Sequence, residues 1–168
     1  MKNKKAQSWG IDLMVAVMIF SIGILVFFIY STNYSGEAEE NFEQLSYDGE
    51  IIVNSLFSDG YPKNWNPEDY TKIGLLSEDK INESKLKYFY DIVQANYANT
   101  KNHFKTRFDY YFFLNVNMTI DGAIVEGIGK PEIDKDNVNL DSSNLVKITR
   151  FSIYKNKPVT AYVYIWEE

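Results

Sequence analysis

GIDLMVAVMIFSIGILVFFIY, residues 10–30, is the stretch of this 168-residue sequence that decides its fold. It contains no proline and one side chain that is charged at neutral pH, that of Asp12. A helix of this length covers about 30 Å, the thickness of the hydrocarbon core of a bilayer. The stretch therefore predicts a membrane-spanning helix, and the rest of the chain has the length of one soluble domain.

Asp12 is unusual in such a helix, because a charge at the membrane centre costs roughly 2.5–3.5 kcal/mol on insertion scales. Ala16 and Phe20 follow it on the same helix face, so an ionised carboxylate there needs a cation or hydrogen-bond donors. Two interpretations stay open. Asp12 pairs with a neighbouring copy in an assembled array, or it lies at headgroup level near the helix start, where the helix dipole favours a carboxylate.

The charge distribution predicts the orientation of the chain. The formal net charge is −6, although Lys2, Lys4 and Lys5 precede the apolar stretch. This basic flank predicts a cytoplasmic N-terminus and an exported C-terminal domain. The rest of the chain is acidic, so nucleic acid and anionic lipid surfaces are poor partners for it. The absence of cysteine excludes disulfides and thiolate metal sites.

The apolar segment differs from an ordinary secretory signal, which has a shorter apolar core followed by small residues at a cleavage site. After Tyr30 the chain continues with STNYSGEAEE, a polar sequence that favours a helix. We therefore expect the segment to be retained.

The sequence KKAQS at residues 4–8, with Asp12 just inside the apolar helix, resembles the class III (type IV prepilin) signal of archaeal pilins and archaellins. The resemblance is specific over residues 2–30 and only architectural beyond them. In that family a membrane prepilin peptidase removes the basic leader, which implies a cut between Ala6 and Gln7. Asp12 then becomes the sixth mature residue, whereas many pilins carry the acidic residue at the fifth.

This resemblance implies a leader at residues 1–6, a transmembrane and assembly helix at 7–33, and an extracellular head at 34–168. It also implies that the chain associates with itself or with related pilins into a surface filament, after a first stage in the membrane. In such an array the freed amine of a neighbouring Gln7 pairs with Asp12 and sets the helical register.

Residues 35–57 read as an amphipathic helix that opens with several glutamates, which suit the first turn of a helix. Its apolar residues near helical spacing are Phe42, Leu45, Ile52 and Leu56. We expect this helix to continue the apolar one, so that residues 10–57 form one long helix with a bend near 33–36. The second half of this long helix is expected to pack against the head.

The next segment, up to about residue 105, joins this helix to the predicted strands. SDGYP at 58–62 predicts the helix end, because Asp-Gly favours a turn and Pro disfavours helix before it. Trp65 is interpreted as a ring that pins the loop, with a sugar-binding platform as the alternative. Asn82 predicts the N-cap of a helix starting at Glu83. His103, the only histidine, has no spaced partner ligands and predicts no metal or catalytic site.

Residues 108–120 change to the period-two pattern of a strand. One face carries Tyr110, Phe112, Leu114, Val116, Met118 and Ile120. Asp121-Gly122 predicts a hairpin turn, and residues 123–128 its partner strand.

The C-terminal segment predicts two further strands at 145–154 and 159–166, joined by a turn at 155–158. Both faces of the last strand are largely apolar or aromatic, which a central place in the sheet explains. An edge place would instead leave a Tyr/Trp stripe exposed for contact with another subunit. The expected fold is therefore α+β: a long N-terminal helix packed on a head with an antiparallel sheet.

Two polar features suggest ligands or modification. The connection at 130–143 contains Asp134, Asp136, Asn137, Asn139 and Asp141, but the EF-hand order fails, so a solvated loop is the default and Ca²⁺ the alternative. Three N-glycosylation sequons begin at Asn33, Asn82 and Asn117, and Asn117 falls on the polar face of its strand. Such triplets also arise by chance in an Asn-rich chain.

No nucleophile elbow, phosphate loop or metal-spaced set of ligands occurs in the sequence, so we expect neither an enzyme nor a cofactor. The leading hypothesis is a structural subunit, a major or minor pilin, of a surface filament that serves adhesion, motility or uptake. The alternative is a single-pass membrane-anchored module whose extracellular head binds a partner.

Overall fold

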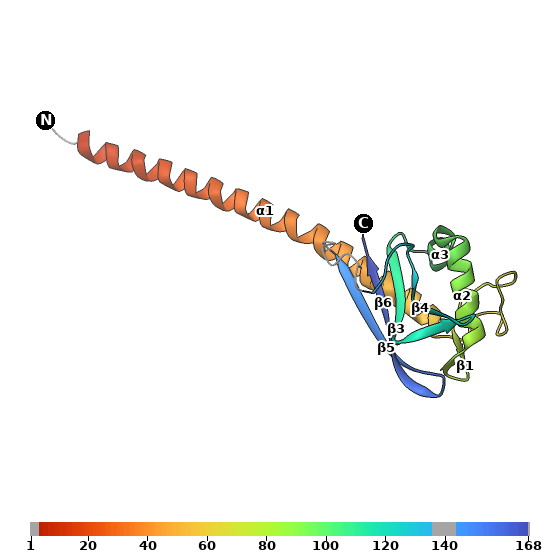
Figure 1. Cartoon of the computed structure of the whole chain (residues 1–168). Helices are drawn as coiled ribbons and strands as arrows, with labels where there is room; N and C mark the ends of the chain where they lie inside the picture. The colour runs from red at the N-terminus through yellow and green to blue at the C-terminus, as the bar shows by residue number, and fades with distance from the viewer. Residues whose placement is uncertain (1–3, 136–143, 168) are drawn as a thin grey trace. The chain divides into compact units, whose positions relative to one another are not determined.

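The structure, a computed structural model, describes the backbone of residues 4–135 and 144–167, and their side chains except those of residues 4–9 and 33–40 (Figure 1). The chain divides into two compact units, Met1–Asn41 and Phe42–Glu168. We call the second unit the head. The class is α+β, as predicted: a long exposed apolar helix, then helices and a four-stranded antiparallel sheet.

The described part of the first unit is entirely helical. It belongs to helix α1 (Lys4–Leu56), whose last residues form part of the head. Its segment Gly10–Thr32, 23 residues long, is long and apolar enough to cross a membrane, as a membrane anchor or a signal sequence would be. The large apolar side chains of this segment are 49–71 % exposed. The prediction of one helix continuing from residue 10 to about 57 is confirmed, so the glutamates at 37–43 do not form a first turn. The bend stays a prediction.

The last four turns of α1 supply one side of the head's core. Leu45, Ile52 and Leu56 are fully buried, as their spacing predicts. Phe42 is 52 % exposed, so its predicted burial is wrong; it lies ahead of the first turn of α1 that packs into the core. Close packing on the sheet depends on Gly49, where an added Cβ would lie 2.7 Å from Cδ1 of Ile148.

The loop after α1 is held by the buried Trp65 ring, as predicted, and by buried hydrogen bonds that were not predicted. The buried Trp65 indole donates to the Gly74 carbonyl oxygen over 2.8 Å, and the Ser55 hydroxyl donates to the Ile73 carbonyl oxygen over 2.7 Å. Two short strands follow, β1 (Leu76–Ser77) and β2 (Lys80–Ile81). A ring that is buried in this way cannot form an exposed sugar platform.

Two helices complete the helical side of the head, α2 (Glu83–Ala95) and α3 (Tyr97–Phe104). The predicted cap is confirmed: the Asn82 side-chain oxygen accepts hydrogen bonds from the backbone amides of Ser84 and Lys85. Most of the polar segment that precedes the first long strand therefore forms helix α3.

The sheet has the order β4-β3-β6-β5, with all pairs antiparallel. Its strands are β3 (Asp109–Ile120), β4 (Ala123–Gly129), β5 (Leu145–Tyr154) and β6 (Lys157–Trp166). The Asp121-Gly122 turn is confirmed, with both residues at positive φ as a two-residue hairpin requires. The central place of the last strand is also confirmed, since β6 lies between β3 and β5.

The inner sheet face packs on the helices, and the prediction of which residues it contains is wrong for one residue. Phe112, Leu114 and Met118 are buried in the main core, whereas Val116 is 42 % exposed. The reason is an irregularity in the β3–β4 register between Phe113 and Met118, which breaks the period-two alternation.

A second aromatic cluster occupies the outer sheet face. Its buried members are Tyr111, Phe113 and Trp166, and Ile133 packs against them. Part of the connection after β4 therefore lies on the sheet, so the predicted solvated loop is wrong for Ile133, whose side chain adds apolar area to this face. The residues 136–143, which include most of the proposed Ca²⁺ ligands, lie outside the described part of the chain.

Candidate assembly helix and head surfaces

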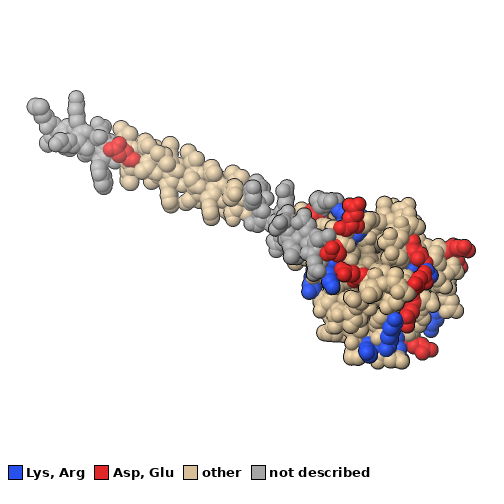
Figure 2. All heavy atoms as spheres, in the orientation of Figure 1, with Lys and Arg blue, Asp and Glu red and all other residues tan. Residues whose placement is uncertain are grey.

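Asp12 is the first candidate site residue, and it lies within the exposed apolar segment of α1. Gly10–Thr32 contains no other ionisable side chain before Tyr30. Figure 2 shows this contrast: the described part of the exposed helix carries one acidic side chain and no basic one. The segment contains no Lys or Arg, so the Asp12 carboxylate has no cationic partner among the described side chains of this unit. It is also exposed, so no apolar neighbour covers it.

The leader residues and one sequon offer only backbone information. Ala6, Gln7 and Asn33 all lie in the helical backbone of α1, and their side chains are outside the described part. The predicted cut between Ala6 and Gln7 therefore stays a prediction.

The two sequons of the head differ in what their asparagines do. The Asn82 side chain caps α2 through its oxygen and donates through its nitrogen to the Ser77 hydroxyl over 3.3 Å. Asn117 lies in the exposed stretch of β3 where the register with β4 is irregular. Asn82 and Asn117 thus lie on separate elements, and only Asn117 presents its amide to solvent without a role in a cap.

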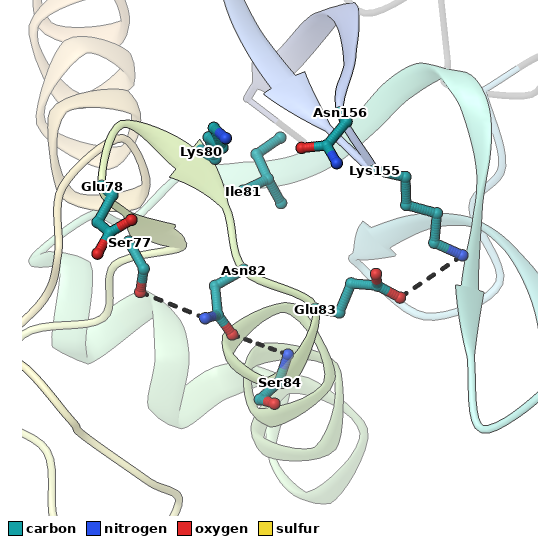
Figure 3. Close-up of a pocket in the computed structure, with 9 residues that line it drawn as sticks. All are labelled: Ser77, Glu78, Lys80, Ile81, Asn82, Glu83, Ser84, Lys155 and Asn156. Carbon is teal, nitrogen blue, oxygen red and sulfur yellow. Dashed lines mark hydrogen bonds and ion pairs between the residues drawn. The ribbon is translucent and has the colours of Figure 1, made fainter.

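An open pocket of about 560 Å³ surrounds the start of α2. Figure 3 shows it between the β1–β2 hairpin, the first turn of α2 and the β5–β6 turn, with the Lys155 amine directed at the Glu83 carboxylate. That ion pair spans 3.5 Å, and Asn82, which is hydrogen-bonded to Ser77 and Ser84, also lines the pocket. Lys155 thus pairs with Glu83, and Asn82 pairs with Ser77, so part of the polar lining is already engaged within the chain.

A smaller open depression of about 300 Å³ lies beside the solvent side of α1. Half-buried His103 lines it, with its ring 5.0 Å from the Tyr70 ring. Burial lowers the pKa of His103, and a hydrogen bond with the Thr71 backbone acts in the opposite direction. The His103 ring is tilted against the Tyr70 ring, so it serves packing here.

A buried charge cluster at the start of β3 was not predicted. Asp109 is only 6 % exposed, and its carboxylate accepts hydrogen bonds from Lys101 over 2.7 Å and from Lys130 over 2.8 Å. The Tyr97 hydroxyl donates to the same carboxylate over 3.0 Å and accepts the Tyr110 backbone amide over 3.0 Å. The cluster ties α3, β3 and the connection after β4 to one another.

The electrostatics of this cluster favour a carboxylate. Burial acts to raise the pKa of Asp109, but the hydrogen bonds from Lys101 and Lys130 outweigh it and hold the pKa below its usual range. Burial raises the pKa of Tyr97 far above its usual value, so its hydroxyl remains a donor. Two cations and a phenol that are hydrogen-bonded to one carboxylate hold these elements together.

Two further buried polar residues also escaped prediction. The Lys85 amine donates to the backbone carbonyls of Asp59 and Leu76, over 2.9 and 2.6 Å, and so fixes the loop after α1. Asp48, buried on α1, accepts hydrogen bonds from Gln44 and Thr106. Sequence offers a signal only for Gln44–Asp48, whose i,i+4 spacing brings them together on a helix.

No group of three His, Asp or Glu side chains that could hold a metal ion occurs in the described ranges 4–135 and 144–167. Comparison of the chain with protein-family models, with curated proteins and with solved structures finds no match.

Proposed function

We propose that this chain is a structural subunit of a type IV pilus-like surface filament, assembled through its N-terminal helix. The observation that carries the proposal is the apolar segment Gly10–Thr32, which is exposed throughout and holds a single acidic residue. A tether needs only the apolar residues, whereas Asp12 gives the segment a group that requires a partner. The basic leader-like sequence before it supplies the signal for export and processing.

The architecture of the chain is consistent with a pilin-like subunit. An apolar helix continues into a head whose core it helps to form through Leu45, Ile52 and Leu56. One continuous helix therefore contributes both the apolar assembly segment and part of the core of the head. In the proposed sequence of events the chain first spans the membrane with its head outside, loses residues 1–6 to a prepilin peptidase, and then joins the array.

In the array, the Asp12 carboxylate accepts a hydrogen bond from the new amino terminus of a neighbouring Gln7 and forms an ion pair with it. An ion pair in a low-dielectric helix bundle gains strongly from correct geometry and loses strongly when one partner is missing. Asp12 thus favours one register among the many that an apolar surface alone would allow. The proposed role is structural, with no catalytic step.

Mass spectrometry of the protein extracted from membranes tests this proposal. Loss of residues 1–6, leaving Gln7 as the first residue, supports it. Retention of Lys2 to Ala6 in the whole population would contradict it and would leave the helix as the tether of a surface binding module. A variant with Lys4 and Lys5 both changed to Ser serves as the control, because it keeps the apolar helix but alters the leader.

A further inference from the structure

The charges of this chain are segregated along the sequence. Residues 6–62 contain no Lys or Arg, and their acidic residues concentrate in 37–50. Those are Glu37, Glu39, Glu40, Glu43, Asp48 and Glu50. Residues 144–166, the β5–β6 hairpin, contain no Asp or Glu, and their basic residues are Lys147, Arg150, Lys155 and Lys157. A chain with a net charge of −6 thus carries one wholly basic hairpin.

The head part of α1 turns one face to solvent. Leu45 and Ile52 point into the core, so residues half a turn away, Glu43, Tyr47 and Asn54, form the opposite side and are exposed. Tyr47 is 65 % exposed. We call Glu43, Tyr47 and Asn54 the helix face. It combines aromatic area with negative charge.

The β5–β6 hairpin turns its other side away from α1. Ile148 lies against Gly49, and Arg150 forms an ion pair with Glu50 over 2.6 Å, so these residues point toward the helix. Their neighbours along β5 alternate to the outer side. We call these outer residues, Lys147, Thr149, Phe151 and Ile153, the sheet face.

Exposed apolar area and positive charge coincide on the sheet face. Phe151 is 83 % exposed, the highest value of any large apolar side chain in the described part of the chain, and Ile153 is 37 % exposed. The Lys147 amine lies 4.3 Å from the centre of the Tyr162 ring. Lys157 adds positive charge at the turn that ends the hairpin, where Lys155 is paired with Glu83 of the same chain.

We propose that the sheet face of one copy docks on the helix face of a second copy of this chain. The proposal rests on the proposed function, since it adds a contact between heads to the contact between helices. Charge complementarity selects the occupant: the basic, aromatic sheet face fits an acidic, aromatic surface, and the helix face of the same chain type is one. Cation–π contacts between lysine and the exposed tyrosine would add to it.

The two faces lie on opposite sides of the head, because α1 covers the inner side of the sheet. They therefore cannot meet within one chain. Contact between two different surfaces is heterologous, and each docked copy leaves one face of each kind open for the next. The head contact thus extends an array in one direction, as a filament requires.

Cysteine cross-linking of the full-length chain in native membranes and in sheared surface material tests the contact. The chain has no cysteine, so Asn54→Cys and Thr149→Cys place one thiol on each face and leave the aromatic and charged side chains intact. With a short bis-maleimide we expect a ladder of dimers, trimers and higher species from the double variant. Each single variant should give dimers at most. The pair Gln94→Cys with Thr149→Cys is the matched control, since Gln94 is exposed on α2 outside the helix face.

Charge reversal within the Asn54/Thr149 cysteine background tests the cause. Lys147→Glu should lower the ladder yield by at least about fivefold, and Glu43→Lys in the same chain should restore it. Phe151→Ala should lower the yield without being rescued. Urea midpoints of all variants, equal to that of the parent, show that the head stays folded.

A ladder no stronger than that of the Gln94 control would overturn the docking contact, whether or not filaments form. Unchanged yield in Lys147→Glu would overturn it as well. Filaments with processed chains but no ladder leave the proposed function standing and refute only the head contact. Unprocessed chains outside filaments refute the proposed function, and a ladder among such chains still supports the contact.

Discussion

Replacing Asp109 by Asn removes the charge from the cluster at the start of β3 and keeps the shape of the side chain. The Asp109 side chain is 7 % exposed, and its partners Lys101 and Lys130 are 22 % exposed. Hydrogen bonds to charged groups contribute about 1.5–3 kcal/mol, and breaking a fully buried ion pair costs about 3–5 kcal/mol. Because both lysines retain some solvent, we expect Asp109→Asn to lower the free energy of unfolding by about 2–3 kcal/mol at pH 7.

The pH dependence of this loss follows from the direction of the pKa shift. The pKa of Asp109 in the folded chain lies below its usual value, since the two lysines outweigh the effect of burial. The stabilisation from the ionised carboxylate is therefore fully present above the unfolded pKa of about 3.9 and is lost as the pH falls through the lower folded pKa. The difference between wild type and variant should be constant from pH 7 to 5 and shrink below pH 4.

Urea unfolding of the full-length chain in detergent, followed by the fluorescence of the buried Trp65 and Trp166, measures this difference. Asp121→Asn is the matched control, because Asp121 pairs with Lys87 at an exposed turn, where Asn-Gly is also a favoured sequence. It should have no resolvable effect. The reasoning would be refuted if Asp109→Asn matched this control at pH 7, or if its effect persisted undiminished at pH 2.

Three further outcomes are expected. Asn82→Ala should lower the free energy of unfolding by about 1 kcal/mol, since two backbone amides of α2 lose their acceptor; urea unfolding with unchanged stability would show that the cap is dispensable. Ile52→Ala should cost about 2–5 kcal/mol at its fully buried site, and Asn54→Ala less than about 0.5 kcal/mol on the exposed side of the same helix; equal costs in the same assay would exclude docking of α1 on the sheet. Asp12→Ala should reduce the amount of chain in sheared surface material about tenfold by quantitative proteomics, while its amount in membranes is unchanged, because the helix loses its register group but none of its apolar length; an unchanged surface amount would remove Asp12 from assembly.

Most of the fold could be predicted from local sequence patterns. The apolar run at 10–30, the Asn82 cap, the Asp121-Gly122 turn and the last strand each follow from neighbouring residues, because helix spans, caps and hairpins are decided within a few positions. The class and the central place of β6 followed from these elements and from the two apolar faces of that strand.

What sequence could not supply depends on contacts between distant residues or on irregular pairing. The Asp109 cluster joins α3, β3 and the segment after β4, and the buried Asp48 meets Thr106 across 58 positions. Neither has a spacing that marks it. Val116 was misplaced because an irregular register has no sequence signature in a strand of alternating residues. Phe42 was misplaced because periodicity gives the side of a helix but not the point where packing begins.

Some features of the candidate site could also be recognised from the sequence, and others could not. The apolar segment and Asp12 could be recognised from composition alone, since one acidic residue among apolar ones is visible without a structure. The helix face and the sheet face could not, because the exposure of Tyr47 and Phe151 depends on which sides of α1 and β5 the core covers. Charge segregation along the chain gained its meaning only when the helix face and the sheet face proved to lie on opposite sides of the head.

Electron microscopy of surface appendages sheared from the source cell, with proteomics of the same fraction, tests the assembly of this chain most directly. We predict thin filaments whose fraction contains this chain as a main component, beginning at Gln7. The account would be contradicted if the chain were absent from the sheared filaments and remained in the membrane with residues 1–6 attached.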